Sequence, residues 1–177
     1  MKEAEQFKLN PASVSSSTWS KLATATVARQ YHSTALLLPD GRVWTGGSNP
    51  NNSDDREERM EVFSPPYLFK GLRPTIVSAP DRLEWNKDFT ISCSNPGAIS
   101  HAVLIRCGSA THGFDVDQRL VELQVDSRTN TNVVFKLLPD RNILPPGHYM
   151  LFALNAAGVP SRAVIVSCGG SSSERIC

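Results

Sequence analysis

The sequence predicts an all-β protein, and two patterns carry that prediction. Apolar runs of about four to eight residues, rich in β-branched side chains and bounded by Gly, Pro, Asn, Asp and Ser, recur along the chain. Turn signals separate them, as at Pro39-Asp40-Gly41, Asn95-Pro96-Gly97 and Pro139-Asp140. The runs lie at residues 33–38, 89–93, 102–107, 120–125, 132–137, 149–155 and 163–168. The one window with helical character, residues 54–62, is rich in charges and is interpreted as a solvated loop or a single turn.

Residues 1–66 contain the opening hairpin of a kelch-type propeller blade. A strand that ends at Leu38 enters a tight Asp-Gly turn, and a second strand at residues 42–45 ends in two glycines. Trp19 is expected to close a preceding blade, and residues 61–63 to form a later strand of the same blade. These pieces amount to about one and a half blades, whereas repeat proteins need about three units to enclose a core. We therefore expect a partial propeller that packs against upstream propeller blades, in a chain that is the C-terminal part of a longer protein.

A proline-rich break separates this part from a second domain. The linker is assigned to residues 67–73, the domain to 74–168 and a flexible tail to 169–177. About a hundred residues with regularly spaced strands and turns fit an immunoglobulin-like β-sandwich. Tyr149 begins the penultimate strand after a Pro-Gly turn, which is typical of a tyrosine corner, so its phenol is expected to donate a hydrogen bond to upstream backbone.

Charge and hydropathy exclude several classes of protein. The chain of 177 residues has 18 Lys and Arg against 17 Asp and Glu, and its net charge is +1. That balance supplies no long-range attraction for nucleic acid or an anionic membrane. No run approaches the roughly 18 apolar residues of a membrane-spanning helix, and the polar N-terminus lacks the apolar core of a signal peptide. We expect no nucleic acid, no membrane partner and no signal peptide in the chain as written.

The four cysteines are Cys93, Cys107, Cys168 and Cys177, and no two of them form a C-x-x-C pair. That spacing argues against a zinc ribbon or a thioredoxin-type redox motif. The first three alternate in register with apolar strand residues, so they are expected to face the sandwich core. Buried thiols or one disulfide are both compatible with this pattern, which leaves the pairing and the redox compartment open.

Tyr31, His32 and His112 are the candidate metal ligands. Neighbours on a regular strand point to opposite faces, so Tyr31 and His32 can address one site only from the irregular entry before the strand at 33–38. His112 lies in a loop flanked by glycines, which frees its imidazole to project away from its own domain. Two imidazoles and a phenol oxygen suit a tetragonal Cu(II) site with open positions, provided that the sandwich docks on the propeller mouth. The alternative is that these are ordinary surface or packing residues.

The remaining polar candidates favour structural roles. His101 precedes a strand and His148 lies in the turn before Tyr149, so both are interpreted as structural or surface residues. Asp115 and Asp117, with Gln118 and Arg119, could form a carboxylate site, but they are interpreted as a hydrogen-bonded network that fixes the His112 loop, or as solvated side chains. The sequence contains no nucleophile elbow, no phosphate-binding glycine loop and no basic stripe with interleaved aromatic residues.

Several segments resemble one family. Residues 29–41, Arg-Gln-Tyr-His-Ser-Thr-Ala-Leu-Leu-Leu-Pro-Asp-Gly, and the Gly-Gly-Ser-Asn-Pro-Asn at 46–51 resemble the last propeller blade of the copper radical oxidases, the galactose oxidase and glyoxal oxidase family. Ser-Pro-Pro-Tyr-Leu at 64–68 resembles the family's link into its C-terminal domain. Four further segments resemble the family's C-terminal early-set sandwich: residues 108–112, 117–119, 146–152 and 155–161. The segment at 46–51 is closer to the glyoxal oxidase branch.

The resemblance implies a function and a site. Carried over by position, Tyr31 would be the axial tyrosine that accepts the substrate's proton, and His32 and His112 the two equatorial ligands of copper. The family's remaining equatorial ligand is a tyrosine cross-linked to a cysteine, and this side chain holds a radical. Family members are mostly secreted and oxidise aldehydes or primary alcohols with O2, giving H2O2.

The radical-bearing cysteine and tyrosine of the family lie upstream of the part that this chain resembles. Tyr67 lies in the linker and Tyr149 in the corner, and neither is placed beside a cysteine at the propeller mouth. We therefore expect the chain to supply three copper ligands without catalysing turnover by itself. The competing hypothesis is a non-catalytic early-set module that serves interaction or carbohydrate association.

Overall fold

The computed structural model describes residues 3–8, 10, 13–49, 56–112, 114–137 and 140–169. These residues form strands and three short 3-10 helices, which confirms the all-β class. No helix among them is long and apolar enough to cross a membrane. Some sequence predictions fall outside the described residues, namely those on Pro50-Asn51, the first two residues of the window 54–62, Gly113, Pro139, Cys177 and residues 170–177 of the tail.

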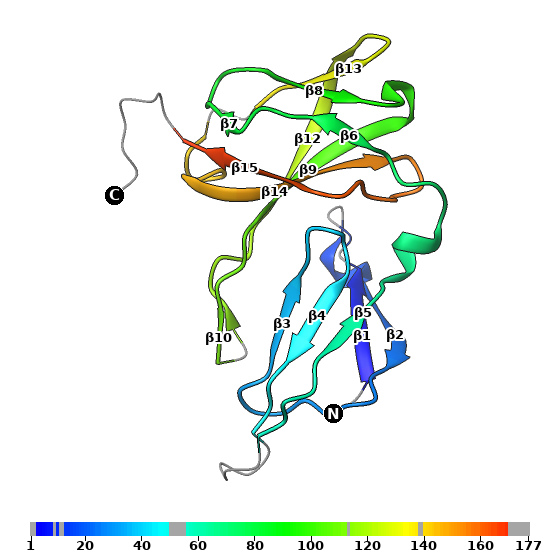
Figure 1. The fold of residues 1–177 in the computed structure, drawn as a ribbon, viewed down its shortest axis with the longest axis vertical. Coiled ribbons are helices and arrows are strands. Elements are labelled where there is room, and N and C mark those ends of the chain that lie inside the picture. Colours follow the sequence, from blue (N-terminus) through cyan, green and yellow to red (C-terminus); the bar gives the residue numbers. More distant parts are fainter. Residues whose placement is uncertain are drawn as a thin grey trace.

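The N-terminal part contains two small antiparallel sheets (Figure 1). In the first, β1 (Glu3–Lys8) pairs with β2 (Thr18–Thr24), which follows the 3-10 helix η1 (Val14–Ser16). The second has the order β3-β4-β5, formed by Thr34–Leu37, Val43–Gly46 and Glu61–Phe63. This second sheet is the partial blade that the sequence predicts.

The turn between β3 and β4 has the predicted hairpin geometry. The Gly41 amide donates to the Leu38 carbonyl at 2.8 Å, and the Leu38 amide donates to the Arg42 carbonyl at 2.8 Å. Gly41 has a φ of +83°, a conformation that glycine adopts without steric cost. The Asp-Gly turn thus brings β3 and β4 into register, with Leu36 opposite Trp44.

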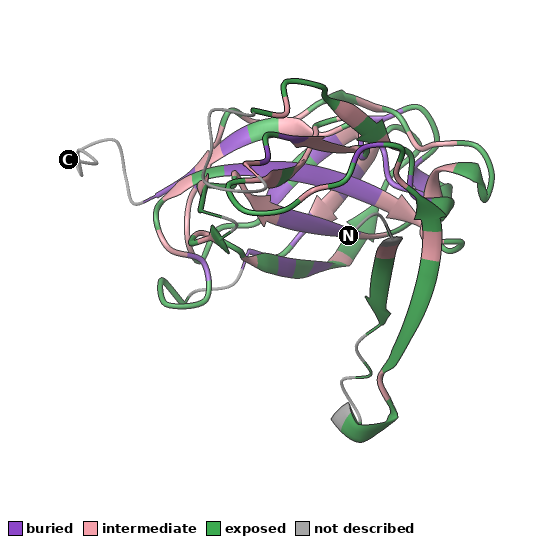
Figure 2. Ribbon diagram, turned by 90° about the horizontal axis from the view of Figure 1, so that it is seen from below, coloured by how far each residue is buried: buried purple, intermediate pink, exposed green. Residues whose placement is uncertain are grey.

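The β1–β2 hairpin projects away from the rest of the molecule. Figure 2 shows exposed residues along it, while buried residues concentrate in the C-terminal domain. Trp19, expected to close a preceding blade, is 67% exposed and lies beside Phe7 with ring centroids 4.8 Å apart. The Glu61 carboxylate of β5 accepts hydrogen bonds from the Thr26 and Val27 amides, and so ties the segment after β2 to the blade.

The C-terminal domain is one eight-stranded sheet that curls back on itself. Its order is β6-β8-β13-β12-β9-β14-β15-β7, and Figure 1 shows β6, β8 and β13 lying over β9, β14 and β15. The strands of the sheet are β6 (Ile76–Ser78), β7 (Arg82–Leu83), β8 (Phe89–Cys93), β9 (Ile99–Arg106), β12 (Leu120–Arg128), β13 (Asn132–Phe135), β14 (Gly147–Asn155) and β15 (Val164–Cys168). The 3-10 helix η3 (Pro96–Ala98) precedes β9.

Strand β12 joins the two layers of the sandwich. Its first part pairs with β9, its last part pairs with β13, and the register shifts between Val125 and Ser127. A strand that changes partners at such an irregularity forms the corner of a sandwich. The two layers enclose fully buried side chains that include Ile91, Leu104 and Leu151. The predicted immunoglobulin-like sandwich is confirmed, with its layers continuous through β12.

The tyrosine corner is present as predicted. The Tyr149 hydroxyl donates to the Pro145 carbonyl at 2.7 Å, and the Tyr149 side chain is fully buried. Burial raises the pKa of this phenol. The corner fixes the start of β14, which is the central strand between β9 and β15.

Strands β9 and β14 are apolar on both faces because the blade covers their outer face. Alternate residues of β14, such as Leu151, face the sandwich core, whereas Met150 and Phe152 form a second cluster with Val103 of β9. Leu37 of β3 packs against this second cluster. The partial blade and the sandwich therefore share an apolar contact.

The placement of Cys107 corrects the prediction for the cysteines. Cys93 and Cys168 are buried in the sandwich core, but Cys107 is only partly buried and packs against the second cluster, on the face that meets the blade. All three are free thiols. Because β9 is apolar on both faces, alternation alone does not show which face points into the sandwich core.

The connector is fixed to both parts. It contains the 3-10 helix η2 (Pro66–Phe69), and the Tyr67 hydroxyl donates to the Gly41 carbonyl of the blade at 2.5 Å. The Arg73 guanidinium donates to the carbonyls of Pro160 and Ser161 in the sandwich at 2.9 and 2.7 Å. These contacts hold the blade and the sandwich in a defined relative position.

Candidate metal centre

Three side chains predicted as ligands meet between the blade and the sandwich. The ring centroids of His32 and His112 are 5.1 Å apart, with the planes at 70°. Tyr31 stacks on His32 at a centroid distance of 3.9 Å. Tyr31 and His32 precede β3, and His112 lies between β10 (Ala110–Thr111) and β11 (Phe114–Asp115), a hairpin that extends from the sandwich alongside β3 (Figure 1). The docking of the two parts therefore brings together residues that are far apart in the sequence.

Both histidines have a strained backbone. The φ angles of His32 and His112 are +60° and +52°, in the left-handed region that non-glycine residues rarely adopt. Such conformations cost about 1–3 kcal/mol each and cluster at functional sites, where surrounding structure enforces them. Among the described residues, only two other non-glycine residues have a positive φ, and one of them, Ser48, lies in the segment beside Tyr31.

The segment at 46–49 holds the Tyr31-His32 loop in place. The Asn49 amide donates to the Tyr31 carbonyl at 2.7 Å, and the Gln30 amide donates to the Ser48 hydroxyl at 3.0 Å. Gly47 has a φ of +71°, and a Cβ there would lie 2.6 Å from the His32 carbonyl oxygen. Position 47 therefore requires glycine, because any side chain would push against the backbone of His32.

Arg29, paired with Glu61, links this loop to other segments of the blade, a role that the sequence did not predict. The Arg29 guanidinium donates to the carbonyls of Gly47 and Arg59 at 2.7 and 2.8 Å, and it lies 3.7 Å from the Glu61 carboxylate. The pKa of Glu61 is lowered, chiefly by the hydrogen bond from the Thr26 hydroxyl. The pair spans blade segments separated by 32 residues, so local sequence patterns give no signal for it.

Asp115 fixes the base of the His112 hairpin. Its carboxylate accepts hydrogen bonds from the amides of Ser109 and Asp117 at 2.9 and 3.1 Å. Asp117 in turn forms an ion pair with Arg106 of β9 at 3.2 Å. The predicted network around Asp115 and Asp117 is therefore confirmed, and it anchors the hairpin to the sandwich.

Replacing Asp115 with alanine is expected to loosen the hairpin. Two backbone amides lose a charged acceptor, and hydrogen bonds to charged groups are worth about 1.5–3 kcal/mol each. Amide hydrogen exchange at Ser109 and Asp117 is expected to accelerate by about 10-fold or more. Asp126→Ala, which removes the ion pair between Asp126 of β12 and Lys136, the residue after β13, is the matched control and should leave both amides unchanged. Equal exchange rates in the Asp115→Ala and wild-type chains would contradict the anchoring role.

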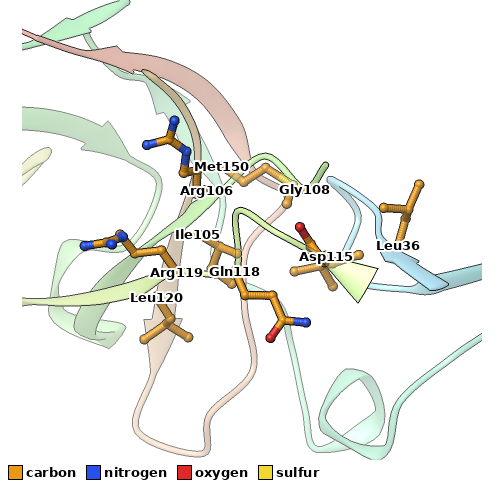
Figure 3. A pocket seen from close by; sticks show the side chains of 10 residues that line it. Leu36, Ile105, Arg106, Gly108, Asp115, Gln118, Arg119, Leu120 and Met150 are labelled. Atoms are coloured by element: carbon orange, nitrogen blue, oxygen red, sulfur yellow. The ribbon is translucent and has the colours of Figure 1, made fainter. Parts of the chain in front are cut away.

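A cavity of about 360 Å³ lies behind the hairpin, between the blade and the sandwich (Figure 3). Its lining combines apolar side chains such as Leu36 with the polar groups of Arg106, Asp115 and Gln118. None of the three predicted ligands lines it. The cavity therefore belongs to the base of the hairpin, while His112 lies at the tip of the hairpin and contacts His32 of the blade.

The donors at the site are two imidazoles and one phenol. Within the described residues, no group of three or more His, Cys, Asp and Glu side chains is placed to hold a metal ion. Tyr31 is 56% exposed, so the site is open to other molecules on the tyrosine side. His101 and His148 lie on β9 and β14, and His148 is exposed, in agreement with the structural or surface roles expected for them.

Two family models match the two parts of this chain, the partial blade and the sandwich. The family described as "Galactose oxidase-like, Early set domain" matches residues 73–168, and "Glyoxal oxidase N-terminus" matches residues 4–67. The chain belongs to the galactose oxidase-like early-set family.

Individual relatives agree with this assignment. An aldehyde oxidase, GLOX, of Vitis pseudoreticulata is 40% identical over 159 residues, which cover 80% of this chain and 30% of that protein. A galactose oxidase of Gibberella zeae is 36% identical over 144 residues, which cover 77% of this chain and 21% of that protein. A fungal alcohol oxidase of the AA5 family, solved in complex with copper, superposes with a TM-score of 0.78 and 31% identity over 90% of this chain and 34% of that one. The chain thus spans about a third or less of these relatives.

The donor set of this chain fits copper. Nitrogen and oxygen ligands with open positions suit Cu(II), and the imidazoles of His32 and His112 are close enough to approach one ion. Tyr31 adds an oxygen donor beside them. Among the described residues, no group of three or more His, Cys, Asp and Glu side chains supplies further metal ligands at this site.

Proposed function

We propose that this chain contributes Tyr31, His32 and His112 as copper ligands to a copper radical oxidase that acts on aldehydes or primary alcohols with O2. One observation carries the proposal: docking of the sandwich on the blade brings the ring centroid of His112 to 5.1 Å from that of His32, which stacks on Tyr31. The relatives named as aldehyde, galactose and alcohol oxidases support the reaction class.

In the proposed reaction, an alcohol RCH2OH and O2 give RCHO and H2O2, or a hydrated aldehyde and O2 give a carboxylic acid and H2O2. Two electrons and two protons leave the substrate and reach O2 in either case. Bound copper would supply the open coordination position and the one-electron chemistry. The imidazoles of His32 and His112 would hold the ion, and the oxygen of Tyr31, which is an exposed residue, would be deprotonated as a metal ligand and would accept the substrate's hydroxyl proton.

The described residues of this chain do not supply the radical-bearing side chain of the proposed enzyme. Tyr67 donates its hydroxyl to the blade, and Tyr149 lies in the sandwich core, so neither reaches the site. Cys93 and Cys168 are in the same core, and burial raises the pKa of both thiols, that of Cys168 to about 11. We propose that upstream propeller blades provide the missing cysteine and tyrosine.

A copper titration of the purified 177-residue chain tests the proposal. We expect one Cu(II) per chain in competition with a chelator, and no peroxide from methylglyoxal or galactose above that of the His32→Ala chain. Failure to bind copper more tightly than His32→Ala would overturn the proposed ligand set. Peroxide formation above that control would contradict the assignment of the radical side chain to other polypeptide.

A further inference from the structure

A hydroxyl group lies against one nitrogen of His112. The Thr111 Oγ1 is 2.7 Å from the His112 Nδ1, which is hydrogen-bonding distance. A neutral imidazole has one nitrogen that donates and one that accepts, and the partner of one nitrogen decides the state of the other. The direction of this hydrogen bond therefore decides which His112 nitrogen is available to a metal.

The two directions of this hydrogen bond have opposite consequences. If the Thr111 hydroxyl donates to Nδ1, the proton of the neutral ring is on Nε2, and neither nitrogen is free to bind a metal. If the Nδ1–H donates to Oγ1, Nε2 keeps its lone pair at the far end of the ring. Only the second arrangement is compatible with His112 and His32 binding one ion.

We propose that Thr111 is a positioning residue: its hydroxyl oxygen accepts the Nδ1–H of His112 and so selects the tautomer that presents the Nε2 lone pair to the metal. This inference rests on the proposed copper site. A metal-binding histidine usually donates the N–H of the ring nitrogen that does not bind the metal to a fixed acceptor, which sets the tautomer and the orientation of the ring.

The hairpin makes Thr111 well suited to this role. Thr111 is the last residue of β10 and pairs with Phe114 of β11, so its backbone is fixed by the strand pairing. Its β-branched side chain has few χ1 states, which limits the positions of the hydroxyl. His112 follows in the left-handed conformation. The loop geometry and the hydroxyl together restrain the imidazole.

The tautomer can be measured without copper. With histidine labelled by 15N in the full chain, one-bond and long-range 15N–1H correlations at about pH 8, above the ordinary histidine pKa near 6.5, distinguish Nδ1–H from Nε2–H. The His112→Ala chain identifies the His112 signals among those of four histidines. We expect Nδ1–H in the wild type and in Thr111→Ser, and loss of that preference in Thr111→Val. An Nε2–H ring in the wild type, or the same tautomer in Thr111→Val, would overturn the inference.

Copper affinity supplies the second measurement. Thr111→Val is expected to weaken Cu(II) binding by about 10-fold, within the 10–100-fold range typical of partners of metal ligands, and Thr111→Ser should remain within about 3-fold. Thr90→Val, at an exposed threonine of β8, is the matched control and should bind as the wild type does. Unchanged affinity in Thr111→Val also overturns the inference. If the wild type binds no copper, the proposed function fails, and the tautomer in the metal-free chain still decides the role of Thr111.

Discussion

Replacing either His32 or His112 with alanine is expected to weaken Cu(II) binding by more than about 100-fold, beyond the usual loss for a partner of a metal ligand. The three protein donors come from two separate parts of the fold, so loss of one imidazole leaves a phenol and a single nitrogen. A chelator competition with the 177-residue chain measures the change. The effect of the double substitution should be much smaller than the sum of the two single effects, since either one already dismantles the site.

His148→Ala is the control for these substitutions. His148 is an exposed histidine on β14, so its loss removes an imidazole from the surface without touching the site. Copper affinity within about 3-fold of the wild type is expected for it, well below the change at a metal ligand. A loss in His148→Ala as large as that in His112→Ala would show that copper binds to surface histidines in general.

Leu151→Ala is expected to lower the free energy of unfolding by about 2–5 kcal/mol. Leu151 is fully buried at the middle of β14, where it pairs with Leu104 of β9 on one side and Val164 of β15 on the other. Truncation leaves a cavity between both layers of the sandwich, which close packing cannot readily fill. Urea unfolding monitored by tryptophan fluorescence measures the change in midpoint.

Leu120→Ala makes the same chemical change at a site of opposite burial. Leu120 begins β12 and is 61% exposed, so its truncation is expected to cost about 1 kcal/mol or less. If Leu120→Ala destabilised the chain as much as Leu151→Ala, the sandwich core would not be the main source of stability.

The sequence contained enough information to predict the class of fold and most central strands. Strand β8 runs over the predicted residues 89–93, and the predicted strands at 149–155 and 163–168 differ from β14 and β15 by one or two residues at an end. These strands are apolar and end at turn residues, so local signals suffice. Strand β1 was not predicted, because its residues are mostly polar and it forms only through pairing with β2.

The face that each strand buries was harder to predict. Period-two alternation tells which residues share a face, but not what covers that face. Cys107 is predicted in the sandwich core, whereas it packs with Val103 on the side of β9 that meets the blade. Only the docking of Leu37 on this surface explains why both faces of the strand are apolar.

At the candidate site, the sequence singled out the three proposed ligands but not the residues that support them. Tyr31, His32 and His112 were identified from their positions at a strand entry and in a glycine-flanked loop, and the structure brings them together. Arg29 and Ser48 act on partners 16 residues or more away, which no local pattern reveals. The contact between Thr111 and its neighbour His112 depends on the side-chain conformations of the hairpin, which adjacency alone does not define.

The central claim is that His32 from the blade and His112 from the sandwich bind the same copper ion. Electron paramagnetic resonance of the chain loaded with one equivalent of Cu(II) tests it most directly, because nitrogen couplings count the imidazoles bound to the metal. We predict two imidazole nitrogens in the wild type and one in each of His32→Ala and His112→Ala. A wild-type spectrum with a single imidazole, or one that either substitution leaves unchanged, would contradict the claim.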